Sequence, residues 1–325
     1  MSRNRREPGP TRGGAPSARP GTGPEPTAWH LAAIVAAAAA GAAWFLFAES
    51  GIAGQWGYSL DDSWIYATFA RNLATGHGYS FNPGEHIGGA TGPLYVFILA
   101  GLYSLFRDVV MPAKILGITC LAASGIVVYY TMRLMDPRDR AKPLLAGVLV
   151  VLSPVLLWGA VAGLELPVYL LVACIGFLFY VRDRKSLAVA VWAVGVWLRP
   201  DGLFLVALGL LLQRGPTLRA SMKTILVALL ILGAYFAFNE AVGGSLFPTS
   251  VGVKTHFDAA VVGRERMVVG QWLDLWGVPH RAGRFEGDAV LLLPALIVGA
   301  VLSYRRWPVL AAYVLGFPLT FALIG

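Results

Sequence analysis

Residues 29–48 read WHLAAIVAAAAAGAAWFLFA, an apolar run without Asp, Glu, Lys or Arg. A run of about 20 such residues is long enough to cross the hydrocarbon core of a bilayer as one helix. The runs lack the two-residue alternation that marks β-barrel strands. Similar runs recur near residues 111–132, 144–162, 166–181, 186–198, 201–213, 224–240, 289–304 and 309–325. The sequence therefore predicts an all-α, polytopic transmembrane helical bundle with about nine or ten spans.

The composition of the chain agrees with a membrane protein. Hydrophobic residues make up 57% of the 325 residues and charged residues only 14%, with a mean hydropathy of +0.64. A soluble domain carries about 25% charged residues. The net charge of +8 comes from short basic clusters between apolar runs, so it indicates orientation in a membrane and not nucleic-acid binding. Cys120 and Cys174 stand alone inside apolar runs and read as small buried hydrophobes.

The basic clusters predict the topology. Residues 1–27 are rich in Pro, Gly and Arg, which predicts a disordered cytoplasmic N-terminal arm ahead of a transmembrane domain at 28–325. The first run is long and lacks a cleavage site, which disfavours a signal peptide. The same rule places the loops 49–92 and 241–288 on the outer side. We expect this membrane to be the plasma (inner) membrane. The basic clusters predicted to face the cytoplasm lie at 133–142, 182–185, 214–223 and 305–306.

One apolar segment conflicts with this topology. If both 93–107 and 111–132 crossed the membrane, the basic loop at 133–142 would lie outside. At 1.5 Å per residue, the 93–107 segment is too short for a standard crossing. We expect it to lie along the interface, or to enter the bilayer and return.

The first outer loop predicts a short amphipathic helix at the membrane surface. Asp61 or Asp62 suits its N-cap, and Gly76 suits its C-terminal stop. Its apolar stripe recurs every four residues at Ile65, Phe69 and Leu73. A capping role explains one aspartate better than two, since adjacent like charges repel. The second carboxylate indicates a general base, or a base together with a metal ligand.

The loop also resembles a known family. Its segments 61–66 (DDSWIY), 70–78 (ARNLATGHG), 81–85 (FNPGE) and 88–95 (GGATGPLY) resemble the first outer loop of GT-C glycosyltransferases. The likeness is greatest to bacterial members, including actinobacterial cell-wall arabinofuranosyltransferases. Protein O-mannosyltransferases and the aminoarabinose transferase of lipid A are more distant relatives. Three further segments are similar to family motifs: 162–167 (AGLELP), 198–202 (LRPDG) and 244–249 (GSLFPT), the last followed by Lys254.

The chain departs from the family pattern at several positions. Leu164 and Leu166 stand where the family has Met and Thr, and Asp201 stands where it has Glu. The resemblance covers about residues 55–260, and the chain ends at Gly325 within an apolar run. Family members usually continue with more spans and an outer C-terminal domain. We therefore expect a short member, a truncated product or a fragment.

The resemblance implies inverting transfer of a hexose or pentose from a polyprenyl-phosphate donor. The acceptor would be a hydroxyl on a glycan, lipid or protein of the cell envelope, at the extracytoplasmic face. An ionised carboxylate at the interface can take the acceptor proton, which predicts Asp61 as general base with Asp62 beside it. Cations near the leaving phosphate would stabilise the transition state. The candidates for this role are Arg71, Arg199 and Lys254.

Other residues extend the predicted site. Glu165 could join Asp62 in holding Mg²⁺ or Mn²⁺, or could instead cap the helix that enters at Pro167. Arg199 could instead extend to the interface as a structural residue. No P-loop or dinucleotide fingerprint is found, so we expect no nucleotide cofactor. The candidate sugar contacts are Trp64, Tyr66, His77 and Glu85.

Two other functions stay open. A transporter of lipid or solute usually shows internal repeats with broken helices. No such repeat relates the two halves of this chain, and its polar residues gather in outer loops. An inactive GT-C-like membrane scaffold is the other alternative, because the acceptor-binding parts of the family would be missing from so short a chain.

Overall fold

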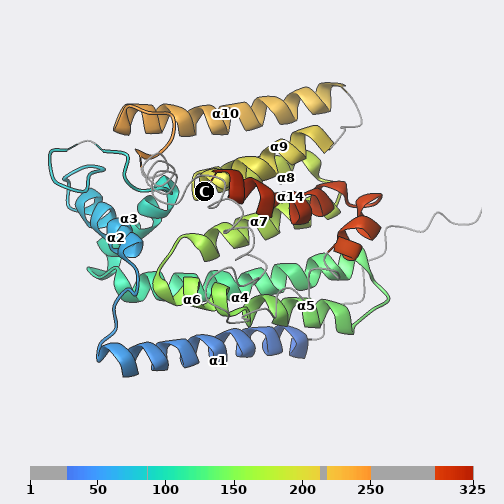
Figure 1. The fold of residues 1–325 in the computed structure, drawn as a ribbon, viewed down its shortest axis with the longest axis horizontal. Helices are drawn as coiled ribbons and strands as arrows, with labels where there is room; N and C mark the ends of the chain where they lie inside the picture. Colours follow the sequence, from blue (N-terminus) through green and yellow to red (C-terminus); the bar gives the residue numbers. More distant parts are fainter. Residues whose placement is uncertain (1–27, 86, 213–217, 250–296, 325) are drawn as a thin grey trace, which may run out of the picture.

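The protein is helical throughout the part that the structure describes (Figure 1). This computed structural model describes residues 28–85, 87–212, 218–249 and 297–324, and every regular element in these ranges is a helix. The all-α prediction is thus confirmed for those ranges. The predicted arm at 1–27, most of the 241–288 loop and Lys254 lie outside the described residues.

Three of the described helices are long and apolar enough to cross a membrane. They are α1 (Ala28–Ala53), α4 (Val110–Met135) and the part of α10 (Leu218–Gly243) from Ser221 onward. A fourth crossing would need α5 (Ala141–Val151) and α6 (Pro154–Ala162) together, and these two meet at a bend of 47°. The sequence predicted an apolar segment at 144–162, and the structure divides this segment between the two helices. The break follows from Pro154, which lacks an N–H and keeps Ser153 in an extended conformation.

The remaining helices are shorter. They are α2 (Asp61–Ala74), α3 (Pro93–Phe106), α7 (Leu166–Val181), α8 (Lys185–Val196), the 3₁₀ turn η1 (Pro200–Gly202), α9 (Leu203–Leu212) and α14 (Pro308–Ile324). The described residues 297–304 are also helical. At 1.5 Å per residue, the 12 residues of α8 extend well short of a bilayer core of ~30 Å. The count of about nine or ten spans therefore stays a prediction that relies partly on short helices.

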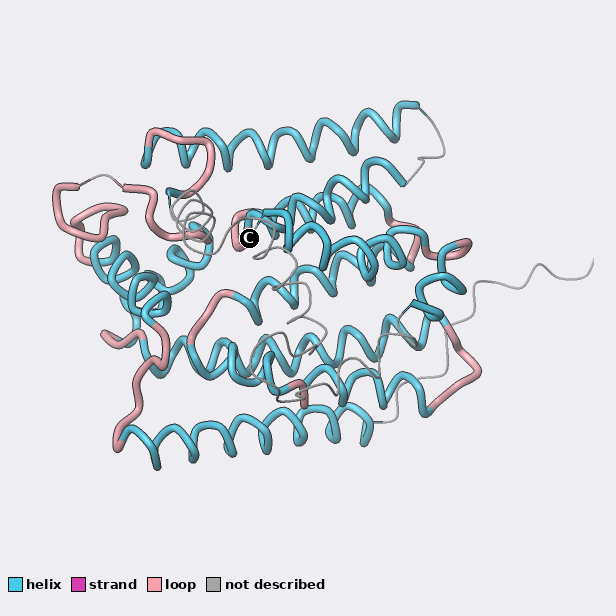
Figure 2. The backbone as a smooth tube through the Cα atoms, viewed as in Figure 1, coloured by secondary structure: helices cyan, strands magenta, loops and turns pink. Residues whose placement is uncertain are grey.

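The helices lie roughly side by side, and the two ends of the bundle differ in charge (Figure 1). The basic segments 133–142, 182–185 and 305–306 lie together at one end, here called the basic end. The opposite end, here called the α2 end, holds α2 and α3 and the longest described loops (Figure 2). The predicted topology groups the same segments. Among the described residues between α1 and α4, the helices are α2 and α3, with 14 residues each, and neither is long enough for a standard crossing.

The helix α2 is held on α3 by its apolar stripe. The predicted stripe is present, but it faces the protein: Phe69 is fully buried, and Ile65 and Leu73 pack against the same cluster. The helix begins at Asp61, so Leu60 occupies the cap position and the predicted aspartate cap is wrong. At the other end Gly76 follows the helix with φ of 86°, a left-handed conformation suited to glycine and to the predicted stop.

Candidate functional site

Residues 88–92 of the first loop lie where several distant segments meet. The backbone N–H and hydroxyl of Thr249 both donate to the carbonyl oxygen of Gly88, at 2.9 and 3.1 Å. At the other end of the segment, the N–H of Leu94 donates to the carbonyl oxygen of Trp197 at 3.0 Å. The structure thus brings together the family-like segments 88–95, 198–202 and 244–249.

The fourth family-like segment joins the same region. The hydroxyl of Tyr95 donates to the carbonyl oxygen of Gly163 at 2.9 Å. Gly163 has φ of 78° and lies directly against the ring of Tyr58, which leaves no room for a side chain. Gly92 likewise lies against the carbonyl of Leu198, where any Cβ would overlap the oxygen. Glycine is therefore required at both close approaches. The segments 88–95, 162–167, 198–202 and 244–249, which are far apart in the sequence, form one structural unit.

A cluster of three charged side chains lies within this unit. Arg199 Nη1 donates to Glu165 Oε1 at 2.7 Å, and Arg199 Nε lies 3.2 Å from both carboxylate oxygens of Asp201. Glu165 occupies the cap position of α7 but makes no capping hydrogen bond. Burial of Arg199 disfavours its charge, yet the carboxylates of Asp201 and Glu165 outweigh this and raise the pKa of the guanidinium. The guanidinium therefore stays charged and holds two helix ends together.

Tyr66 connects this cluster to α2. Its hydroxyl oxygen accepts a hydrogen bond from the N–H of Gly92 at 3.1 Å, and its side chain is buried. Burial raises the pKa of Tyr66 well above its ordinary value, Glu165 raises it further, and Arg199 opposes this. Tyr66 lies one helical turn after Asp62, on the same side of α2. The aspartate pair thus lies about one turn from a tyrosine whose pKa is affected by the charges of Glu165 and Arg199.

The two aspartates occupy the first turn of α2. Asp61 is exposed, and its Oδ1 accepts a hydrogen bond from the N–H of Asp62 at 2.9 Å. Asp62 is half-buried. Acidic side chains are favourable in the first turn of a helix because the first N–H groups carry partial positive charge. Asp61 is accordingly open to water and to a ligand, as a general base must be.

The other candidate residues of the loop lie farther out. Trp64 is 48% exposed and packs against Tyr58, with 5.0 Å between the ring centroids. Arg71 is exposed on the last turn of α2. His77 and Glu85 are also exposed, with local partners in Thr75 and Asn82 respectively. The structure therefore brings Tyr66, Glu165 and Arg199 together, and leaves Arg71, His77 and Glu85 on the surface of the loop.

The predicted metal site is not assembled among the described side chains. Within those ranges no group of three or more His, Cys, Asp and Glu side chains is placed to hold a metal ion. Glu165 is paired with Arg199, and its pairing with Asp62 around Mg²⁺ or Mn²⁺ stays a prediction.

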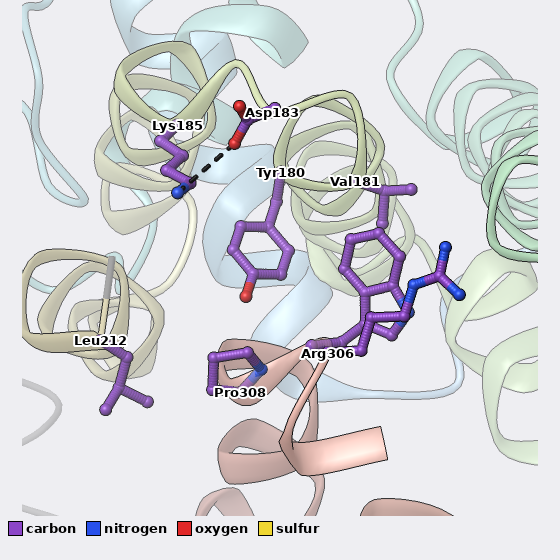
Figure 3. Close-up of a pocket in the computed structure, with 8 residues that line it drawn as sticks. Tyr180, Val181, Asp183, Lys185, Leu212, Arg306 and Pro308 are labelled. Atoms are coloured by element: carbon purple, nitrogen blue, oxygen red, sulfur yellow. Dashed lines mark ion pairs between the residues drawn. The ribbon is translucent and has the colours of Figure 1, made fainter. Parts of the chain in front are cut away.

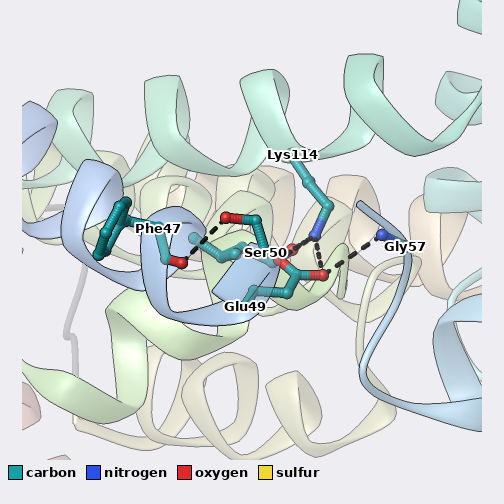
Figure 4. Close-up of polar contacts among 6 residues, drawn as sticks. Phe47, Glu49, Ser50, Gly57 and Lys114 are labelled. Carbon is teal, nitrogen blue, oxygen red and sulfur yellow. Dashed lines mark hydrogen bonds and ion pairs between the residues drawn. The ribbon is translucent and has the colours of Figure 1, made fainter. Parts of the chain in front are cut away.

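A second buried ion pair was missed by the sequence reasoning (Figure 4). Lys114 of α4 is 1% exposed, and its ammonium lies 2.8 and 3.0 Å from the carboxylate oxygens of Glu49. The same ammonium donates to the carbonyl oxygen of Val161 at 2.7 Å. Glu49 Oε1 also accepts from the N–H of Gly57 at 3.4 Å. This contact joins α1, α4 and α6 beneath the first loop. A lysine inside an apolar run was the available signal, since such charges are costly without a partner.

Compared with known proteins, the chain matches no protein-family model, no curated protein and no solved structure. The residues of the α2 end are therefore the observations that bear on function.

Proposed function

We propose that this chain is a membrane glycosyltransferase that moves a sugar from a polyprenyl-phosphate donor to an acceptor hydroxyl of the cell envelope. The observation that carries the proposal is the exposed Asp61, with Asp62 beside it, in the first turn of α2. Tyr66 follows Asp62 by one turn and interacts with the charges of Glu165 and Arg199. The helix α2, which carries the aspartates and Tyr66, lies at the end opposite to the basic segments (Figure 1). By the positive-inside rule, this end would face the outside of the plasma membrane.

The proposed reaction needs one base and a stabilised leaving group. The acceptor oxygen attacks the anomeric carbon, the bond from that carbon to the donor phosphate breaks, and the configuration inverts. Asp61 takes the proton of the acceptor hydroxyl as the new bond forms. The departing polyprenyl phosphate gains about one negative charge, which nearby cations stabilise more in the transition state than in the ground state.

Arg199 can bind a phosphate without leaving its carboxylate partners. A guanidinium has five N–H donors. One N–H of Nη1 engages Glu165 and that of Nε engages Asp201. These contacts with the described residues leave the other three N–H groups, which could donate to a phosphate oxygen. The two carboxylates then orient the guanidinium. Arg71 and Lys254 complete the proposed set of phosphate-binding cations.

The aromatic residues of α2 take different roles in this proposal. Trp64 presents an exposed indole in the turn that holds the aspartates, which suits stacking on a sugar ring. Tyr66 is buried and bonded to Gly92, which suits positioning of the 88–92 segment better than direct contact with a sugar.

The test is transfer of radiolabelled sugar in membranes that contain the protein, from a panel of polyprenyl-phosphate pentoses and hexoses. We expect Asp61→Asn to lower transfer by about 100-fold or more, the usual contribution of a general base. Asp139→Asn at the basic end is the matched control and should keep full activity, with both variants present at wild-type levels. Full activity of Asp61→Asn overturns the catalytic assignment. Uptake of the lipid or a solute by vesicles without any transfer overturns the proposed function.

A further inference from the structure

The indole of Trp64 packs on the loop segment that precedes α2. Its ring lies edge-to-face against Tyr58, with 5.0 Å between the centroids. The backbone of Gly57 is also close, because a Cβ added there would lie 3.9 Å from the indole. Trp64 is nevertheless 48% exposed. The indole is therefore partly held by two loop residues and partly open to a ligand.

This loop segment is anchored to α1 and α4. The Tyr58 hydroxyl donates to the carbonyl oxygen of Val109, directly before α4, at 2.8 Å. Burial raises the pKa of Tyr58, so its hydroxyl keeps the proton for this bond. The N–H of Gly57 donates to Glu49, which is bound in turn by Lys114 (Figure 4). The segment under the indole is thus fixed to the bundle by contacts outside α2.

The Tyr58 ring also contacts the turn that carries Glu165. It lies so close to Gly163 that a Cβ there would overlap it. Gly163 is two residues before Glu165, which pairs with Arg199. Tyr58 is buried between this turn and Trp64. Its ring therefore sets the spacing between the first turn of α2, with its aspartates, and the ion pair of Glu165.

We propose that Tyr58 is a positioning residue for sugar transfer, which holds the Trp64 indole where it stacks on the donor sugar. This inference rests on the proposed function. Tyr58 is buried behind the indole, so it acts through Trp64 and does not touch the sugar. A group misplaced by about 1 Å can cost up to ~100-fold in rate. Loss of the Tyr58 ring therefore weakens donor binding and leaves the proton transfer to Asp61 in place.

The experiment is a double-mutant cycle on kcat/KM for the polyprenyl-phosphate sugar donor. We expect Tyr58→Leu and Trp64→Leu each to lower kcat/KM by about tenfold, mainly through KM. The double variant should lose no more than Trp64→Leu alone, because one residue acts through the other. Tyr58→Phe keeps the ring and should keep most of the activity. Losses that multiply in the double variant would mean that Tyr58 acts independently of Trp64, and would overturn the inference.

The matched control is Tyr180→Leu at the basic end (Figure 3). Tyr180 is also buried, its hydroxyl accepts from the N–H of Val309 at 3.5 Å, and its ring meets Trp307 edge to face. It borders a cavity of about 330 Å³, at the end of the bundle opposite to α2. This variant should lose stability in thermal unfolding and keep the wild-type KM for the donor. An equal rise of KM in this control would mean a general effect of destabilisation and contradict a positioning role.

A second variant approaches the same indole from another residue, and serves where Tyr58→Leu does not fold. Gly57→Val retains Tyr58 and adds methyl groups toward Trp64 from a half-exposed loop position. It should raise the KM for the donor, and should have no further effect in the Trp64→Leu background. An unchanged KM in the Trp64-containing protein would count against the inference.

Hydroxyl-radical footprinting with mass spectrometry tests the same contact without any transfer activity. Labelling of Trp64 should rise in Tyr58→Leu and differ from the wild type in Gly57→Val. Phe81 is the internal control, because it packs on Phe69 in the same loop and its labelling should not change. Unchanged labelling of Trp64 would refute the positioning role. A wild type that transfers no sugar from any donor would instead refute the proposed function, and the two failures are thus distinguishable.

Discussion

The buried contact between Lys114 and Glu49 predicts a large loss of stability when only one partner is removed. In Lys114→Met the side-chain volume is kept and the ammonium is lost. The Glu49 carboxylate, 15% exposed, then keeps only the N–H of Gly57 at 3.4 Å. The carbonyl oxygen of Val161 loses the donor that lies at 2.7 Å.

The expected cost follows from this geometry. Removing one member of a buried ion pair costs about 3–5 kcal/mol, since the other charge stays buried without a partner. Glu49 keeps some contact with water, so we expect about 3 kcal/mol, at the low end of that range. For a protein of this size such a loss lowers the melting temperature by roughly 5–10 °C. The double variant Lys114→Met/Glu49→Gln removes both charges and should recover about 2 kcal/mol of the summed single losses.

Thermal unfolding in detergent can be followed with a thiol-reactive dye, because Cys120 is buried in α4 and becomes reactive when the helix opens. Lys142→Met is the control: its ammonium is 61% exposed and pairs with Asp136 and Asp139 at the surface, so the melting temperature should not change. A Lys114→Met protein that melts with the wild type would refute the reasoning. So would a double variant whose loss equals the sum of the single losses.

Four other outcomes are expected. Gly117→Ala should lower the melting temperature because its Cβ would overlap a carbonyl of α6, whereas Gly233→Ala, with open space around it, should be neutral or stabilising. Burial raises the pKa of Tyr66, so stability should be full below about pH 10, the ordinary pKa of the unfolded side chain, and fall as pH rises further; unchanged melting at pH 11 would contradict this. Arg199→Met should cost about 3 kcal/mol in thermal unfolding because it leaves Glu165 buried and unpaired, and Glu165→Gln should cost less. A chelator should lower transfer activity, and added Mg²⁺ or Mn²⁺ should restore it.

The helical class, the basic end and the short helix α2 could be predicted because their signals are local. The length of an apolar run, a cluster of charges and a four-residue spacing of apolar residues each depend on a stretch no longer than about one helix. The bend before Pro154 could also be predicted locally, because a proline within the apolar segment 144–162 disfavours the helical conformation of the residue before it.

The pairing of charges could not be predicted in the same way. Glu165 is 34 residues from Arg199, and Glu49 is 65 residues from Lys114. Which carboxylate meets which cation depends on how the helices pack, and one sequence carries no direct signal of that packing. Asp201 is two residues from Arg199, so of these three contacts it is the one that nearby sequence could predict.

The charge of the converging segments bears on how a phosphate could bind at the α2 end. In the segments that resemble the family, five carboxylates stand against two guanidiniums: Asp61, Asp62, Glu85, Glu165 and Asp201 against Arg71 and Arg199. An anionic donor would be repelled by such a balance unless a further positive charge lies close to its phosphate. Lys254 and a divalent cation are the two sources that fit the proposed reaction. Oxygen ligands suit Mg²⁺ and Mn²⁺, so an excess of carboxylates is what a site that recruits such a cation would carry.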